Sequence, residues 1–275
     1  MTPVQELLIK AAVRLGAGAA EPGTGPLRVG IDLGTASCVL VVLGEDEDGP
    51  DHPIWVGAEP SGALRDGVVV DFARAAATIG RLKQDAEQAL GVELTAAATA
   101  HPPCVPVPDA RACRFVCEAA GFDEVTLVDE VTAAQRTLDV ADGVVVDVGG
   151  GSTGVGVFRD GRLVALDDRP GGGHHLDLML AGALGLRLED AEPYKRAHPT
   201  ESFPILVPGL QRIAENVRAL TAGAVDLPLH LAGGALMIAG AGDVLANYLE
   251  RTVVTYPHAL LITPIGIAKA AGSAS

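Results

Sequence analysis

The sequence predicts an α/β protein built from two similar lobes, and three observations support this. Apolar strands alternate with helical segments along most of the chain, which is typical of layered α/β folds. A strand–turn–strand pattern at residues 29–43 returns at residues 144–158, so the same unit is expected twice. A chain of 275 residues with 48% hydrophobic content is also long enough for two lobes with cores of their own.

The first 26 residues are predicted to form a separate unit. Residues 3–15 place apolar side chains at helical spacing, and Pro3 suits the first turn of a helix. Residues 16–26 are rich in Gly, Ala and Pro, which is typical of a flexible tether. We therefore expect a detachable helix. It is either an extension, which is disordered or packed on a lobe, or a segment that docks on another protein.

The first lobe is expected to alternate strands with helices. The helix within 68–91 has a polar face at Arg81, Asp85 and Gln88 and a stop signal at Gly91. The expected elements are strands at 27–33 and 38–43, an acidic hairpin loop at 44–50, a strand end and helix within 68–91, a strand at 95–103, a helix at 109–120, and a strand, turn and helix within 125–138.

The second lobe begins by repeating the first. Residues 143–166 predict strand, Asp-Gly turn, strand and a second hairpin at Asp160–Gly161. The elements expected after it are helices at 174–186, 189–197 and 207–221, a strand at 227–231, a helix at 241–250, and a terminal apolar segment whose helix is initiated by Pro264.

Composition excludes several classes of function. The formal net charge is −15 without a basic stripe, so nucleic acid and anionic membranes are poor partners. The first 16 residues carry Glu6, Lys10 and Arg14, which leaves no apolar core for a signal peptide, and no long uncharged apolar run predicts a spanning helix. We expect a cytoplasmic protein, with the four cysteines as reduced core thiols.

Two acidic–glycine turns are the segments that predict chemistry. Asp32-Leu-Gly34-Thr35 and Asp147-Val-Gly149 to Thr153 each place an Asp at a strand end before a tight turn. Small residues let backbone N–H groups approach a phosphate, and carboxylates hold Mg²⁺ through water. One such turn is often only a hairpin. Two in matching positions of a repeat predict a pair of phosphate loops.

Two further segments are candidates with simpler alternatives. Glu130 follows a strand and opens a helix, where an acid either positions an attacking water or merely favours the helix dipole. Residues 231–240 contain the pair Gly233–Gly234, which either admits a base or ribose closely or only packs as a loop.

Taken in order, these segments resemble the actin–Hsp70–sugar-kinase superfamily of ATPases. DLGT (32–35) and DVGGGST (147–153) resemble its two phosphate loops, DEVTAA (129–134) and TPIGIAKAAG (263–272) its two connecting helices, and LAGGALMIAG (231–240) its adenosine loop. The resemblance implies a two-lobed actin-like (ribonuclease H-like) fold, with each lobe a mixed sheet flanked by helices. It implies lobe boundaries at 27–140, with 264–275 returning to it, and 141–263.

The same resemblance implies the roles of the site residues. Asp32 and Asp147 would hold hydrated Mg²⁺ and act in catalysis together with Glu130, which would orient water. ATP or ADP would contact backbone and side chains of a larger set. This set comprises Gly34, Thr35, Gly149, Gly150, Gly151, Ser152, Thr153, Gly172, Gly173, Glu192, Lys195, Gly233 and Gly234.

Four segments are similar to one family in particular, the ethanolamine-utilisation protein J (EutJ) family. They are RDGVVVDF (65–72), AATAHPP (97–103), PGGGHHLDLMLAGA (170–183) and AEPYKRAH (191–198). That family is described as chaperone-like and belongs to bacterial operons for microcompartment-based ethanolamine breakdown. The resemblance implies a cytoplasmic protein, associated with a microcompartment, that opens and closes with the ATP/ADP cycle. Its partners would be enzymes such as the cobalamin-dependent ammonia-lyase, or shell proteins that the N-terminal helix could contact.

One departure bears on activity. The family's Glu-Pro-Thr is here Glu130-Val131-Thr132, which alters the turn that would position water. We therefore expect a slow Mg-dependent ATPase. Two alternatives stay open, a non-hydrolysing ATP-binding assembly adaptor and an actin-like filament-forming scaffold.

Overall fold

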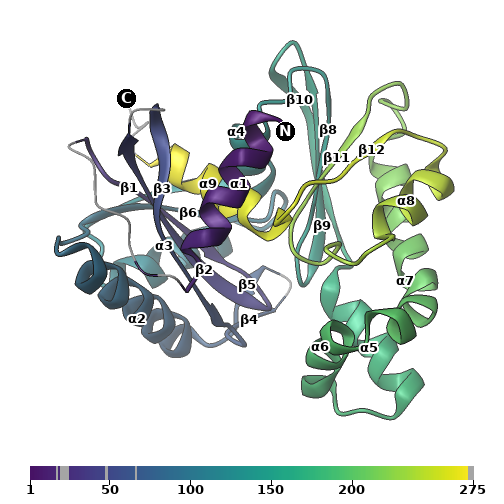
Figure 1. The fold of residues 1–275 in the computed structure, drawn as a ribbon, viewed down its shortest axis with the longest axis horizontal. Coiled ribbons are helices and arrows are strands. Elements are labelled where there is room, and N and C mark those ends of the chain that lie inside the picture. Colours follow the sequence, from purple (N-terminus) through teal and green to yellow (C-terminus); the bar gives the residue numbers. More distant parts are fainter. Residues whose placement is uncertain (17, 19–24, 47–48, 66, 272–275) are drawn as a thin grey trace.

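The computed structural model describes residues 1–16, 18, 25–46, 49–65 and 67–271, and these fold into two lobes joined by a pair of crossing helices (Figure 1). Each lobe contains one five-stranded mixed sheet. The strand order is β3-β2-β1-β6-β7 in the first lobe and β10-β9-β8-β11-β12 in the second. The predicted fold class, with a mixed sheet flanked by helices in each lobe, is confirmed.

The first lobe holds most of the chain's first half. Its elements are α1 (Pro3–Arg14), β1 (Arg28–Leu33), β2 (Ser37–Asp46), β3 (Gly49–Pro60), the small hairpin β4 (Leu64–Arg65) and β5 (Val68–Val69), α2 (Phe72–Leu90), β6 (Ala96–His101), α3 (Val107–Ala119), β7 (Glu124–Asp129) and α4 (Glu130–Leu138).

The second lobe follows, and the chain then returns to the first. Its elements are β8 (Gly143–Val148), β9 (Ser152–Arg159), β10 (Arg162–Pro170), α5 (Gly173–Leu184), α6 (Leu188–Ala197), α7 (Pro199–Leu220), β11 (Leu229–Ala232), α8 (Ala241–Leu249), β12 (Val253–Val254) and the short 3-10 helix η1 (Ala259–Leu261). The last helix, α9 (Ile262–Ala270), packs on β1 and α4.

The predicted repeat extends over both sheets. In each, the first strand pairs antiparallel with the second and parallel with a later one, β1 with β6 and β8 with β11. The registers also match, because Asp32 lies opposite Val39 and Asp147 lies opposite Gly154. Each acid is therefore the next-to-last residue of its strand, beside the same kind of turn.

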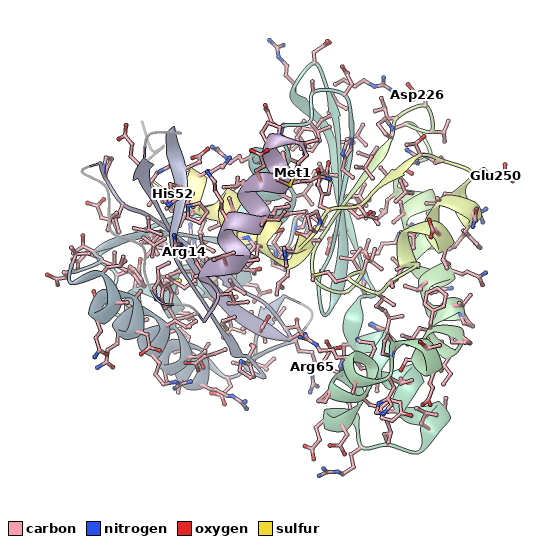
Figure 2. The ribbon with its side chains drawn as sticks, viewed as in Figure 1. Met1, Arg14, His52, Arg65, Asp226 and Glu250 are labelled. Carbon is pink, nitrogen blue, oxygen red and sulfur yellow. The ribbon has the colours of Figure 1, made fainter. Side chains whose placement is uncertain are left out.

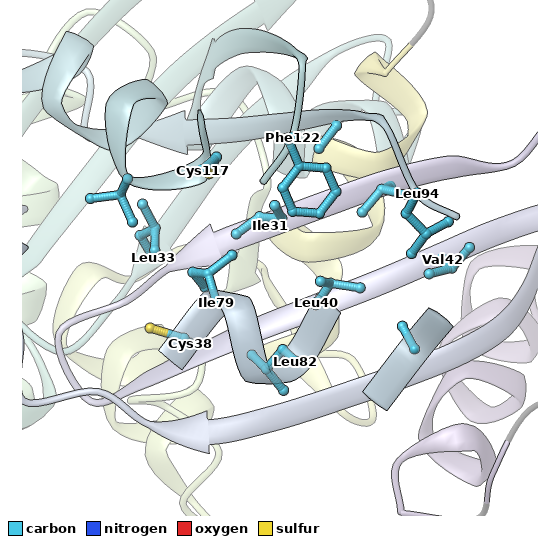
Figure 3. Close-up of a cluster of buried hydrophobic side chains, with 14 of the residues drawn as sticks. Ile31, Leu33, Cys38, Leu40, Val42, Ile79, Leu82, Leu94, Cys117 and Phe122 are labelled. Carbon is cyan, nitrogen blue, oxygen red and sulfur yellow. The ribbon is translucent and has the colours of Figure 1, made fainter. Parts of the chain in front are cut away.

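Side chains alternate along the strands between two apolar layers. On β2, Cys38, Leu40 and Val42 face α2 and α3, where they pack with Ile79 and Phe122 (Figure 3). The residues between them, Val39, Val41 and Leu43, face a second layer that holds α1, α4 and α9. Val145, Phe158 and Ala232 of the second sheet join that layer, which therefore connects the lobes.

Helix α1 is packed on the first lobe. Leu8 and Ala11 are fully buried in the layer that connects the lobes, and the helix contacts β3 and η1. Met1 and Arg14 mark its two ends in Figure 2. The sequence predicts the helix itself and leaves open whether it packs on a lobe, and the structure adds a capping box between Thr2 and Gln5. Most of the predicted tether lies outside the described residues.

The structure differs from the predicted elements at several points. Strand β3 and the two-residue β12 were not predicted, and α7 begins at Pro199 instead of Val207. Prolines within α7 remove backbone donors, but the helix buries Leu206 and Leu210 completely, and this burial outweighs the loss. Cys104 is exposed in the loop after β6, whereas the other three cysteines are buried as expected. Among the described helices, none is long and apolar enough to cross a membrane.

Candidate nucleotide and metal site

The two predicted phosphate loops have the same backbone geometry. The Gly34 N–H donates to the Ser37 carbonyl at 3.1 Å, and the Gly149 N–H donates to the Ser152 carbonyl at 3.1 Å. A Cβ on Gly34 would lie 2.5 Å from the Ser37 carbonyl oxygen, so the first turn requires glycine. The sequence repeat is therefore also a repeat of hydrogen bonding.

The two loops meet across the boundary between the lobes. A Cβ built on Gly150 would lie 3.0 Å from Cβ of Thr35 and 3.3 Å from the backbone nitrogen of Ala36. Only a glycine allows this approach without displacing the first loop. The tips of the loops are thus placed where one anionic group could contact both.

The second loop is held from behind by the start of α5. The N–H groups of Gly173 and His174 donate to the carbonyls of Gly149 and Gly150 at 3.0 and 2.8 Å. Because carbonyl and N–H point in opposite directions across a trans peptide, the N–H groups of Gly150 and Gly151 point away from α5. The buried hydroxyl of Thr153 fixes the same corner by donating to the Gly171 carbonyl at 2.6 Å.

Four loop N–H groups make no hydrogen bond to any described residue, those of Thr35, Ala36, Gly150 and Gly151. Gly151 is buried, and an unpaired buried N–H is rare in folded proteins. Successive N–H groups of this kind form a concave site for anions. The geometry of the loops is therefore suited to phosphate oxygens.

Three carboxyls, those of Asp32, Glu130 and Asp147, act on one another beside the loops. Burial raises the pKa of Asp32 to about 7, and Asp147 adds to the rise. Burial raises the pKa of Asp147 to about 6, although a hydroxyl opposes the rise. Burial also raises the pKa of Glu130 well above its usual range, with further contributions from Asp147 and Asp32.

The charged groups that act on these three carboxyls are themselves carboxylates. Carboxylates that are partly or fully buried, and on which no basic side chain acts strongly, would be stabilised by a cation. Carboxylate oxygens are the ligands that Mg²⁺ prefers, and they usually bind it through some of its waters. The residues present therefore fit the divalent metal that the sequence predicts, and the assignment of Asp32 and Asp147 as its holders stays a prediction.

Asp147 is fixed on both sides by residues from distant segments. The Thr263 hydroxyl, at the start of α9, donates to Oδ2 of Asp147 at 2.5 Å. On the other side, a Cβ on Gly233 would lie 2.5 Å from Oδ1 of Asp147 and 2.3 Å from the Val148 carbonyl oxygen. Gly233 has a φ of +85°, which favours glycine as well. Sequence reasoning did not select Thr263.

Comparison with known proteins identifies the family. The Ethanolamine utilization protein EutJ of Salmonella typhimurium is 36% identical over 244 residues, which covers 88% of this chain and 85% of that protein. The crystal structure of EutJ from Carboxydothermus hydrogenoformans matches with a TM-score of 0.89 and 36% identity, over 96% of this chain and 97% of that one. The chain belongs to the EutJ family. The resemblance drawn from the sequence is confirmed.

The fold of this EutJ family member is shared more widely. A family model described as MreB/Mbl protein matches residues 60–182. The crystal structure of MreB5 of Spiroplasma citri bound to ADP matches with a TM-score of 0.71 over 90% of this chain and 97% of that one. At 16% identity, this match shows a shared fold and nothing more. The chain therefore has the fold of actin-like ATPases.

Glu130 opens α4, and its neighbours fix the start of that helix. The preceding Asp129 caps the helix by accepting the Thr132 N–H at 2.7 Å, which leaves the Glu130 carboxyl for other contacts. Val131, in the position of the family's proline, is fully buried. One of its methyl groups lies 3.0 Å from the position that a Cβ on Gly154 would take, and the other lies 2.5 Å from the position that a Cβ on Gly156 would take. The valine thus packs α4 tightly on β9.

The predicted nucleotide contacts Glu192 and Lys195, on α6, are part of an ion cluster in this EutJ-family structure. Lys195 is buried and pairs with Asp177 of α5 at 2.7 Å and with Glu192. Burial raises the pKa of Asp177, and Lys195 opposes the rise. The cluster holds α5 against α6, and Asp177 was not predicted. The prediction that Glu192 and Lys195 contact a nucleotide remains a prediction.

The predicted adenosine loop has two different parts. Gly233 approaches the chain's own Asp147, as described above, and a Cβ on Gly234 would lie 3.1 Å from a methyl group of Leu260. The residues after the pair border a cavity of about 350 Å³ instead. It is lined by residues 236–240, 242–243 and 255–258. The cavity beside this loop is thus lined by residues that follow the glycine pair.

Proposed function

We propose that this chain binds Mg-ATP between its lobes and hydrolyses it slowly. One observation carries the proposal: the four loop N–H groups without a described acceptor belong to two loops that touch at Gly150 and Thr35. Bound metal would supply positive charge to the phosphates. Asp32 and Asp147 would hold its waters, and Glu130 would orient the attacking water.

The proposal is supported by the fold and by one member of its class. MreB5 of Spiroplasma citri has a structure bound to ADP, and it shares this fold. The three acids with raised pKa values provide the negative charge that a hydrated cation would balance. Slow turnover is proposed because Val131 replaces the family's proline beside Glu130, and carboxylates are the charged groups that act most on Glu130.

Calorimetry and phosphate release on the same sample test the proposal. Wild-type chain is expected to bind ATP with Mg²⁺ and to lose that binding in EDTA. Asp147→Asn should lose Mg-dependent binding, because it removes a charge that faces the metal. Glu130→Gln should keep binding and reduce turnover by roughly 10²–10⁴-fold, the usual contribution of a general base. No binding by the wild type would refute the proposal, and binding without turnover would favour an assembly adaptor.

We also propose the biological role that the family suggests. The chain would act in the cytoplasm as a chaperone-like factor for ethanolamine-utilisation enzymes or shell proteins, and its lobes would close on ATP. Recovery of an inactivated ammonia-lyase with ATP is the measurement. Faster recovery with wild type than with Asp147→Asn would support the role, and equal recovery would contradict it. Light scattering with ATP would reveal filaments, which would favour the scaffold instead.

A further inference from the structure

Thr263 is the residue through which α9 makes a hydrogen bond to a site acid. It lies in the first turn of α9, its side chain is almost entirely buried, and its hydroxyl donates to Oδ2 of Asp147 at 2.5 Å. The two residues are 116 positions apart in the sequence. Asp147 is the next-to-last residue of a strand of the second lobe, whereas α9 packs on β1 of the first. The hydrogen bond therefore connects a site acid to a helix of the other lobe.

Two neighbours restrict the Asp147 carboxylate. Oδ2 accepts the Thr263 hydroxyl, and Oδ1 lies so close to Gly233 that only a glycine fits there. Any other residue at 233 would place a carbon 2.5 Å from Oδ1. A carboxylate held in this way cannot rotate freely. Its orientation is set before a ligand arrives.

The same turn of α9 is tied to α4, which begins at Glu130. The Thr137 hydroxyl of α4 donates to the Ile262 carbonyl at 2.7 Å, one residue before Thr263. The helices cross so closely that a Cβ on Gly266 would lie 1.7 Å from the Ala133 carbonyl oxygen. One turn of α9 thus joins the segments that carry Asp147 and Glu130.

We infer that Thr263 is a positioning residue for the metal site: it orients the Asp147 carboxylate toward the cation and ties its position to the α4–α9 crossing. This inference rests on the proposed metal and nucleotide site, and it adds the residue that organises it. Hydrogen-bond partners of metal-ligating groups commonly change metal affinity by 10–100-fold. Loss of the Thr263 hydroxyl is therefore expected to weaken metal binding about tenfold.

Mn²⁺ alone is the probe, because it prefers the same oxygen ligands as Mg²⁺ and its free form is counted by electron paramagnetic resonance. The full chain is titrated as wild type, Thr263→Val and Thr263→Ser. The valine has nearly the same shape without the donor, and the serine keeps the donor. We expect about tenfold weaker Mn²⁺ binding for Thr263→Val and near wild-type binding for Thr263→Ser. The rise in melting temperature that Mn²⁺ causes should shrink in parallel.

Thr137→Val is the matched control, since it removes a buried hydroxyl from the same helix crossing without touching Asp147. Its melting temperature should fall while its Mn²⁺ affinity stays near that of wild type. If Thr263→Val does not fold, Thr263→Ala replaces it in the comparison with Thr263→Ser. Unchanged affinity in the donor-free variant, or an equal loss in Thr137→Val, would overturn the inference. Wild-type chain that binds ADP but no Mn²⁺ would overturn it too, while leaving nucleotide binding intact.

Discussion

Gly266→Ala tests the crossing of α4 and α9. The added Cβ would lie 1.7 Å from the Ala133 carbonyl oxygen and 2.4 Å from its carbon, whereas real Cβ contacts essentially never fall below 3.0 Å. One helix would have to move by about 1.3 Å, and because the obstacle is backbone, no rotamer change can relieve it. Overpacking costs about 1–3 kcal/mol, and this case belongs near the upper end. Alanine is favoured over glycine in a helix by about 1 kcal/mol, so the net loss should be about 2 kcal/mol.

Urea unfolding at 25 °C measures this loss, and Gly80→Ala is the matched control. Gly80 also lies inside a helix, α2, but nothing lies within 4 Å of its added Cβ. That variant should become more stable by about 0.5–1 kcal/mol, because only the helix preference of alanine acts. Equal free energies of unfolding for the two variants would refute the close crossing.

Two further predictions concern stability. Leu8→Ala should lower the free energy of unfolding by about 2–5 kcal/mol, because Leu8 is fully buried. Ile9→Ala is the control and should cost far less, because Ile9 is exposed; the urea midpoints of both variants test this. In EDTA, stability should fall as pH rises from about 4 to about 7, because the raised pKa values of Asp32 and Asp147 mean that the folded state holds their protons more tightly than the unfolded state. That contribution is complete below their unfolded pKa values near 4 and is lost as pH passes the folded values; a slope unchanged in Asp32→Asn would contradict it.

Local signals in the sequence predicted most of the elements. The echo of VGIDLGTASCVLVVL in VVVDVGGGSTGVGVF was enough to predict two matching strand–turn–strand units, because strand alternation and glycine turns are local properties. Strand β12 is two residues long and left no periodic signal. The start of α7 was misplaced because its prolines act locally, whereas the burial of Leu206 that outweighs them is tertiary.

The sequence predicted site residues only where a local motif marks them. Asp32 and Asp147 stood out as a pair because each precedes a glycine turn. Thr263 did not, because a single threonine in an apolar segment carries no signal until the fold brings it to Asp147. The partner of Lys195 was missed for the same reason, since Asp177 lies on a different helix.

The layer that connects the lobes also constrains how the chain can be made. Leu8 of α1 and Ile265 of α9 belong to that one layer, so residues from near both ends of the described chain complete it together. During synthesis, Val39 and Val41 emerge long before the helix that covers them. The first lobe therefore cannot complete its packing on the ribosome until the second has been translated, which leaves part of an apolar sheet face uncovered, and open to aggregation, for that interval.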